Sequence, residues 1–111
     1  MVRARHIHSG LTGLRFDVAF EKLRFELNSP LIGKINVYNI LAACCVGMTF
    51  QLPPEVIVRG IAECQGVPGR FERVDEGQPF AVVVDYSHTH EALRNAISVA
   101  RTLDAKRVIT L

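Results

Sequence analysis

Residues 67–93 read VPGRFERVDEGQPFAVVVDYSHTHEAL, and this stretch carries the clearest indication of fold class in the chain. An apolar run at 80–84 stops at Asp85, and Tyr86-Ser87-His88-Thr89 separate that run from a segment with helical spacing. A β-branched run that ends in polar side chains before a helix is typical of the strand ends that bind ligands in open α/β sheets. We therefore predict an α/β protein with an acid, an imidazole and two hydroxyls on one tight turn.

The remainder of this region predicts a strand-helix-strand unit. The expected elements are strands at 70–74 and 80–85, a turn at 75–79, a helix at 91–103 and a third strand at 107–111. A parallel pair of strands needs further strands beside it and helices on both faces. We therefore expect a fragment of a larger α/β fold, with a module boundary near 67–69.

The residues before this boundary predict a hairpin followed by two helices. The expected elements are strands at 14–20 and 23–28, with a turn at Glu21-Lys22, and helices at 36–48 and 55–64. Asn36 is a plausible N-cap of the first helix, and Pro53-Pro54 opens the second. The first 13 residues support no assignment, and His6 and His8 are interpreted as part of a solvated or frayed N-terminus rather than as a metal pair.

Composition narrows the function classes. Hydrophobic residues make up 49% and charged residues 22% of the chain, which predicts a folded protein. A net charge of +2 is too weak to indicate a nucleic-acid or anionic membrane partner, and no apolar run approaches the ~20 residues that span a bilayer. Three cysteines, two of them adjacent, are a poor disulfide framework, so we expect reduced, packed thiols and a cytoplasmic protein.

Three blocks of this sequence resemble the Mur ligase family, and its MurE type most closely. The first block resembles the pattern G-x-F-N-V-Y-N-x-L-A-A at residues 33–43, with Ile35 in place of Phe. The second, V-P-G-R-x-E, is complete at 67–72. The third resembles V-D-Y-A-H-T-P-D-A-L at residues 84–93, with Ser87, His90 and Glu91 as the three departures. His90 in place of Pro removes the rigid φ angle at the expected helix start.

The resemblance implies a domain assignment and a nucleotide site. It places residues 1–66 in the C-terminal part of the central ATP-binding domain and residues 67–111 at the start of the Rossmann-like C-terminal domain. It also implies ATP with Mg²⁺ as cofactor, and a nucleotide site that includes Asn36, Asn39, Arg70, Asp85 and His88. The two asparagines are expected near adenine, Arg70 near phosphate or ribose oxygens, Asp85 near the ribose, and His88 near the phosphates. No catalytic residue and no metal ligand is assigned within the chain.

Simpler interpretations of these residues remain open. Asn36 could be a helix cap and Asn39 a polar surface residue. Asp85 could cap the following helix, and Arg70 could form an ion pair with Glu72 or Asp75. His88 suits an ordinary hydrogen-bonding role.

The implied parent protein is an ADP-forming amide ligase that joins an amino acid to a UDP-muramoyl-peptide in peptidoglycan synthesis. No G-x-x-x-x-G-K-[ST] phosphate loop occurs here, so we expect the isolated chain to be inactive. Alternatives are a fragment of a cyanophycin or folylpolyglutamate synthetase, and a non-catalytic remnant that folds or self-associates. The sequence leaves open which amino acid is added, whether Met1 and Leu111 are natural ends, and the oligomeric state.

Overall fold

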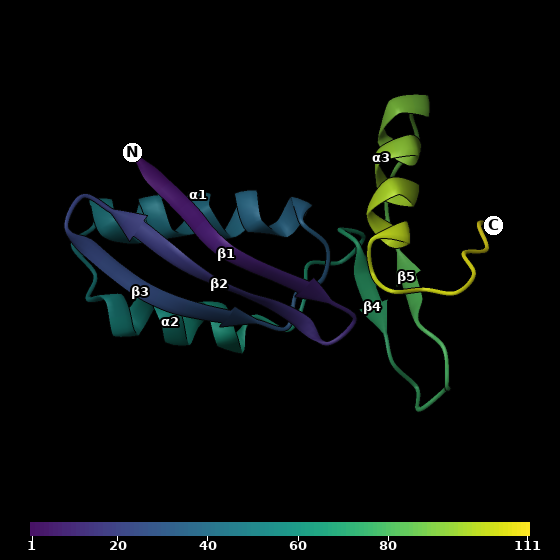
Figure 1. The fold of residues 1–111 in the computed structure, drawn as a ribbon, viewed down its shortest axis with the longest axis horizontal. Coiled ribbons are helices and arrows are strands. Elements are labelled where there is room, and N and C mark those ends of the chain that lie inside the picture. Colours follow the sequence, from purple (N-terminus) through teal and green to yellow (C-terminus); the bar gives the residue numbers. More distant parts are fainter.

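The computed structural model describes all residues, 1–111, as five strands and three helices arranged around two small cores. The elements are β1 (Val2–Gly10), β2 (Gly13–Phe20), β3 (Leu23–Ser29), α1 (Ile35–Thr49), α2 (Pro54–Glu63), β4 (Glu72–Val74), β5 (Val82–Val84) and α3 (His90–Arg101). Strands β1, β2 and β3 form one antiparallel sheet, and β4 and β5 form a separate hairpin (Figure 1). The predicted α/β class is confirmed.

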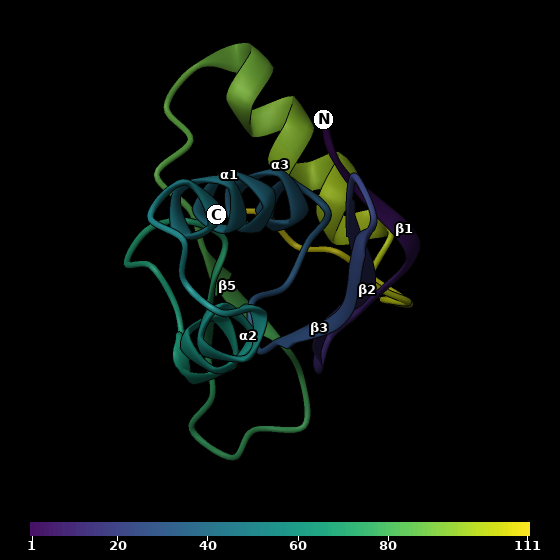
Figure 2. The same ribbon diagram turned by 90° about the vertical axis from the view of Figure 1, so that its left-hand side faces the viewer.

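The hairpin of β2 and β3 forms as the sequence predicted. Phe20 pairs with Leu23, which leaves Glu21 and Lys22 as a two-residue turn, and Glu21 has a positive φ of 53°. Alternation along β2 turns its apolar side chains to one face, which both α1 and α2 cover (Figure 2). The core on this face consists of Leu14, Phe16, Val18, Leu27, Val37, Ile40, Cys44 and Ile57.

Strand β1 overturns the prediction of a frayed N-terminus. It pairs along β2 from Val2, opposite Phe20, to Gly10, and a register shift between Arg5 and His8 interrupts the ladder. Without β1, the outer edge of β2 would present a row of unpaired backbone groups. The irregularity, where His6 has a φ of 50°, breaks the period-2 alternation that would have revealed the strand from sequence.

Helix α1 confirms one prediction and corrects another. The helix spans the predicted segment, but Asn36 lies inside its first turn, where its side chain is buried, and the N-cap position is occupied by Lys34 without a side-chain cap. Cys44 is buried as expected, whereas Cys45 is exposed, so core packing is wrong for that cysteine. None of the helices has both the length and the apolar character that crossing a membrane requires.

The second half of the chain contains the predicted strand and helix but not the predicted third strand. Helix α3 begins close to the expected residue, while residues 107–111 form no strand, and Ile109 is 67% exposed. The strand β5 pairs with β4 in antiparallel fashion instead. Each of these two strands has only three residues. They therefore offer a third, parallel strand only a short edge for hydrogen bonds and a small apolar surface for packing.

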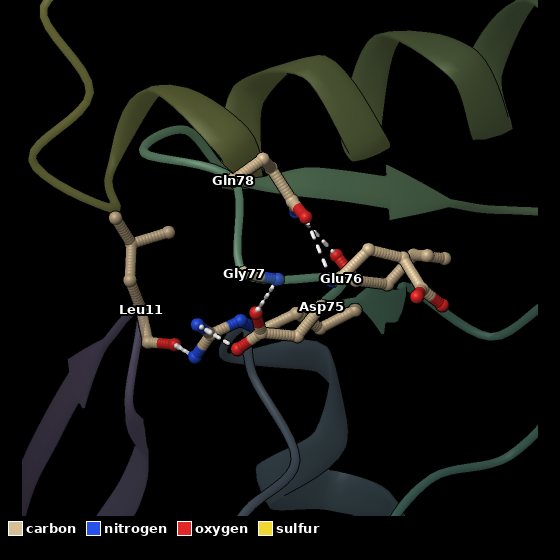
Figure 3. A network of polar contacts seen from close by, with 7 residues as sticks. Leu11, Asp75, Glu76, Gly77 and Gln78 are labelled. Carbon is tan, nitrogen blue, oxygen red and sulfur yellow. Dashed lines mark hydrogen bonds and ion pairs between the residues drawn. The ribbon is translucent and has the colours of Figure 1, made fainter.

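Two contacts join the halves of the chain. A second small core of Ile32, Phe71 and Leu103 unites residues from before α1, from the 69–72 linker and from beyond α3. The second contact is a hydrogen bond from the Arg73 guanidinium to the Leu11 carbonyl at 2.6 Å. The same guanidinium also donates to the Asp75 carboxylate at 2.8 Å (Figure 3). The predicted module boundary near 67–69 is therefore bridged by packing and by a hydrogen bond.

Candidate functional site

The turn at 85–89 is organised by the Asp85 carboxylate. Its Oδ2 atom accepts the Phe71 N–H at 2.8 Å, and its Oδ1 atom accepts the Ser87 N–H at 3.0 Å together with the Ser87 hydroxyl. Asp85 lies directly after β5, at the position that the apolar run predicted. Both carboxylate oxygens thus bind the chain itself, and Oδ2 keeps an acceptor lone pair for a further donor.

One further hydrogen bond joins the linker at 69–72 to this turn, and two more lie within residues 67–72. The Tyr86 N–H donates to the Gly69 carbonyl at 2.8 Å, and the Glu72 carboxylate accepts the Gly69 N–H at 2.9 Å. The Arg70 N–H donates to the Val67 carbonyl at 3.0 Å. The structure therefore brings the V-P-G-R-x-E block and the V-D-Y block side by side, 14 positions apart in sequence between Phe71 and Asp85.

The Arg70 guanidinium is exposed and takes no part in an ion pair. Its two suggested partners are engaged elsewhere, because the Asp75 carboxylate pairs with Arg73 and the Glu72 carboxylate binds the Gly69 backbone. An unpaired guanidinium beside a strand-end turn is a suitable donor for phosphate or carboxylate oxygens.

His88 lies on the exposed side of the same turn. Its Nδ1 atom is 3.0 Å from the Tyr86 carbonyl, and the two rings lie 5.1 Å apart at a tilt of 59°. Thr89 follows and accepts the Ala92 N–H at 3.2 Å, so Thr89, not Asp85, is the N-cap of α3. The interpretation of Asp85 as a cap for α3 is therefore wrong, and Nε2 of His88 is the ring atom left to meet a ligand.

The two asparagines lie at the start of α1 and hydrogen-bond to each other. The Asn36 amide donates to the Ile32 carbonyl at 2.8 Å and accepts the Asn39 amide at 3.0 Å. Asn36 is 2% exposed, whereas Asn39 is exposed. The buried Asn36 therefore orients Asn39, which is the member of the pair that can reach a ligand.

Sequence reasoning missed the role of Phe71, which connects these two regions. Phe71 is 5% exposed and has a φ of 49°, which is unusual for a bulky residue. A Cβ atom built on Gly33, just before α1, would lie 3.1 Å from Phe71 Cδ1. The signal in the sequence was the apolar residue at the variable position of V-P-G-R-x-E, between two charged neighbours. No group of three or more His, Cys, Asp or Glu side chains gathers where it could hold a metal ion.

The strand-end turn and the V-P-G-R linker are two of the three blocks on which the resemblance to the Mur ligase family rests, and comparison with known proteins identifies the family. Residues 69–111 match the family model described as Mur ligase, glutamate ligase domain. The chain belongs to the Mur ligase family, as the resemblance predicted.

One relative that the chain matches is the UDP-N-acetylmuramoyl-L-alanyl-D-glutamate–2,6-diaminopimelate ligase of Solibacter usitatus (strain Ellin6076). This relative is 67% identical over 110 residues, which cover 99% of this chain and 22% of the relative. The alignment thus reaches almost the whole of the first 13 residues, which sequence reasoning had left unmatched. The chain spans about a fifth of the length of the curated relatives it matches.

Solved structures agree on the fold. The UDP-N-acetylmuramoylalanyl-D-glutamyl-2,6-diaminopimelate–D-alanyl-D-alanyl ligase of Acinetobacter baumannii superposes with a TM-score of 0.80 at 24% identity, over 93% of this chain and 23% of that one. A UDP-N-acetylmuramoyl-L-alanyl-D-glutamate–2,6-diaminopimelate ligase superposes with a TM-score of 0.74 at 25% identity, over 95% of this chain and 21% of that one.

Proposed function

We propose that this chain forms part of an ATP-dependent, ADP-forming amide ligase of peptidoglycan synthesis. In this proposal, residues 1–66 are the end of the central ATP-binding domain and residues 67–111 are the start of the C-terminal domain. The single observation that carries it is the 67% identity to a diaminopimelate-adding ligase over 99% of the chain. The same observation favours this ligase over a cyanophycin or folylpolyglutamate synthetase.

The proposed reaction joins a diamino acid to UDP-N-acetylmuramoyl-L-alanyl-D-glutamate. The terminal carboxylate of that substrate is activated as an acyl phosphate and then attacked by the incoming amine. The names of the relatives make 2,6-diaminopimelate the amino acid we propose. ATP and the UDP-linked peptide are the proposed partners, and the cytoplasm is the proposed location.

We propose that four exposed side chains of this chain contribute to the nucleotide site. Arg70 is exposed and free of ion pairs, so its fork of N–H donors is available for phosphate or ribose oxygens. Asp85 keeps one acceptor position on Oδ2, and His88 presents its outer ring nitrogen. Asn39, oriented by Asn36, is available to an adenine edge, where an amide both donates and accepts.

The site is incomplete for phosphoryl transfer within these residues. ATP bound with Mg²⁺ would supply the transferable phosphoryl group, but no cluster of metal-ligand side chains lies in this chain to hold the ion. Phosphoryl transfer relies on charge neutralisation by Mg²⁺ and on a lysine that contacts the phosphates. We therefore propose that these residues bind and orient the nucleotide, and that ligation requires further parts of a longer ligase.

The outer face of α1 supports this placement within a longer ligase. The helix contains no charged residue, and its exposed side includes Ile35, Tyr38 and Val46, which are 53%, 72% and 57% exposed. Large exposed apolar side chains that gather on one helix often mark a surface that another part of a protein covers. In a ligase of the length of these relatives, we propose that this face packs against the rest of the central domain. If the chain were instead a remnant, the same face would drive self-association.

The proposed nucleotide site is tested by calorimetric titration of this chain with ATP and with ADP. We expect weak binding that the Arg70→Ala variant reduces roughly ten-fold or more, since a charge-assisted hydrogen bond contributes about 1.5–3 kcal/mol. Arg59→Ala removes an exposed arginine from α2 and serves as the matched control. Equal affinity of Arg70→Ala and the unsubstituted chain, or no binding by a chain that circular dichroism shows to be folded, would contradict a nucleotide role for Arg70 here.

A further inference from the structure

We propose that Asp85 is a positioning residue that couples the strand-end turn to the start of α1 through Phe71. A continuous set of contacts runs from the Asp85 carboxylate to the Phe71 backbone, from the Phe71 ring to residues 32 and 33, and from these to Asn36. The proposal rests on the proposed function only in naming a nucleotide as the ligand that this coupling serves. The coupling itself is a property of the ligand-free chain.

The first link is the hydrogen bond from the Phe71 N–H to Asp85 Oδ2 at 2.8 Å. Phe71 has a φ of 49°, a left-handed conformation that crowds the Cβ of an L-residue against its own backbone. A charge-assisted hydrogen bond to the amide of that residue stabilises the strained conformation. Strain of this kind persists only where the surroundings enforce it, and Asp85 is the group that binds the strained amide.

The second link is the Phe71 ring. The ring is buried with Ile32 and Leu103, and a Cβ atom on Gly33 would lie 3.1 Å from its Cδ1 atom. The left-handed backbone therefore directs the ring against the segment that leads into α1. A glycine at position 33 permits this close approach, because any side chain there would meet the ring.

The third link runs from this segment to the asparagines. The Asn36 N–H donates to the Gly33 carbonyl at 3.0 Å, and the Asn36 side chain donates to the Ile32 carbonyl at 2.8 Å. The Asn39 amide then donates to Asn36 Oδ1 at 3.0 Å. A shift of the Phe71 ring thus reaches Asn39 through one packed contact and three hydrogen bonds, and a contiguous network of this kind can carry coupling.

A carboxylate is required at position 85 because both of its oxygens accept. Oδ2 serves Phe71, and Oδ1 serves the N–H and the hydroxyl of Ser87. An asparagine has the same shape but one accepting oxygen, so its NH₂ group would face an N–H donor on one side. Asp85→Asn therefore removes one of the two attachments while it leaves the volume of the side chain unchanged.

The test is solution NMR of the complete, ligand-free chain with and without Asp85→Asn. We expect the Phe71 amide to exchange with solvent roughly ten-fold faster or more in the variant, and the side-chain amide signals of Asn36 and Asn39 to shift. Asp75→Asn is the matched control, since Asp75 also accepts a backbone N–H, from Gly77 at 3.2 Å, but on the far turn of the β4–β5 hairpin. This control is expected to leave both readouts at their original values.

Each outcome bears on the coupling. An unchanged Phe71 exchange rate in Asp85→Asn overturns the first link, and faster exchange with unmoved Asn36 and Asn39 signals overturns the coupling to α1. If Asp85→Asn does not fold, the unsubstituted chain still provides a test, because a scalar coupling across the hydrogen bond from Phe71 ¹⁵N to Asp85 ¹³Cγ is expected, and its absence overturns the proposal. None of these readouts uses nucleotide. A failure of the chain to bind ATP would therefore count against the proposed function and not against this coupling.

Discussion

Gly33→Ala is the substitution that most directly tests the junction between the two halves of the chain. Gly33 has a φ of +83°, and an added Cβ atom would lie 2.8 Å from Val99 Cγ1 and 3.1 Å from Phe71 Cδ1. Two separate effects therefore act at one position: a left-handed backbone that alanine adopts poorly, and a collision with side chains from α3 and from the linker.

The expected loss of stability is the sum of these two effects. A left-handed conformation costs an alanine about 1–2 kcal/mol, and overpacking of a closely packed site costs about 1–3 kcal/mol. Gly33→Ala should therefore lower the free energy of unfolding by about 2–5 kcal/mol, a large part of the roughly 5–15 kcal/mol typical of a folded domain. Urea unfolding followed by circular dichroism should show a midpoint lower by about 1–3 M.

Gly60→Ala is the matched control, because Gly60 lies in α2 with no heavy atom within 4 Å of an added Cβ. Alanine in a helix interior is favoured over glycine by about 0.5–1 kcal/mol, so this variant should be more stable than the unsubstituted chain. Repeating Gly33→Ala in a Val99→Ala background removes the closest colliding atom and should reduce its cost by about 1 kcal/mol or more.

A free energy of unfolding for Gly33→Ala within about 0.5 kcal/mol of that of the unsubstituted chain, the range of ordinary surface substitutions, would refute both effects. An equal loss of stability in the Val99→Ala background would refute the collision with α3 alone.

Two further predictions concern single side chains elsewhere in the chain. Thr89→Ala removes the acceptor for the Ala92 N–H and should lower the free energy of unfolding, measured with urea, by about 0.5–2 kcal/mol. Thr49→Ala removes an exposed hydroxyl at the end of α1 and, as the control, should change this free energy by less than about 0.5 kcal/mol. Equal effects of the two substitutions would contradict the capping role of Thr89. Burial raises the pKa of the Cys44 thiol from 9.0 to about 11, and the neighbouring Cys45 adds to this effect. Between pH 9 and pH 11, the thiol therefore keeps its proton in the folded chain and loses it in the unfolded chain. Stability should therefore fall by about 3 kcal/mol at most as pH rises from 9 to 11, measured by urea unfolding, and Cys44→Ala should lack this component.

Local chemistry was sufficient to predict all three helices and one hairpin. Apolar spacing located α1, α2 and α3 within a few residues, and the polar pair Glu21-Lys22 marked a two-residue turn. These features depend on neighbours three or four residues away, or on a single turn, so they are written directly into the order of side chains. The family blocks at 33–43, 67–72 and 84–93 likewise identified a Mur ligase before any contact was seen.

Contacts between distant segments could not be predicted from the sequence. Strand β1 was missed because a register shift after Arg5 breaks its alternation, and a third strand at 107–111 was expected from β-branched residues that find no partner edge. The sequence identified Asp85 and Arg70 as candidates, but it assigned Asp85 either to a ligand or to a cap of the following helix. The structure shows the Asp85 carboxylate bound to the Phe71 amide.

The order of side chains alone thus specified the family, the helices and the residues of the candidate site, because each depends on local spacing or on a short motif. Tertiary structure specified which of those residues are free to meet a ligand. Asn36 is buried and satisfied, Arg70 is unpaired, and Phe71 links two halves of the chain, and each of these depends on atoms brought together from distant positions. The physical reason for this difference is that strand pairing and close packing both depend on partner residues that a local sequence pattern does not specify.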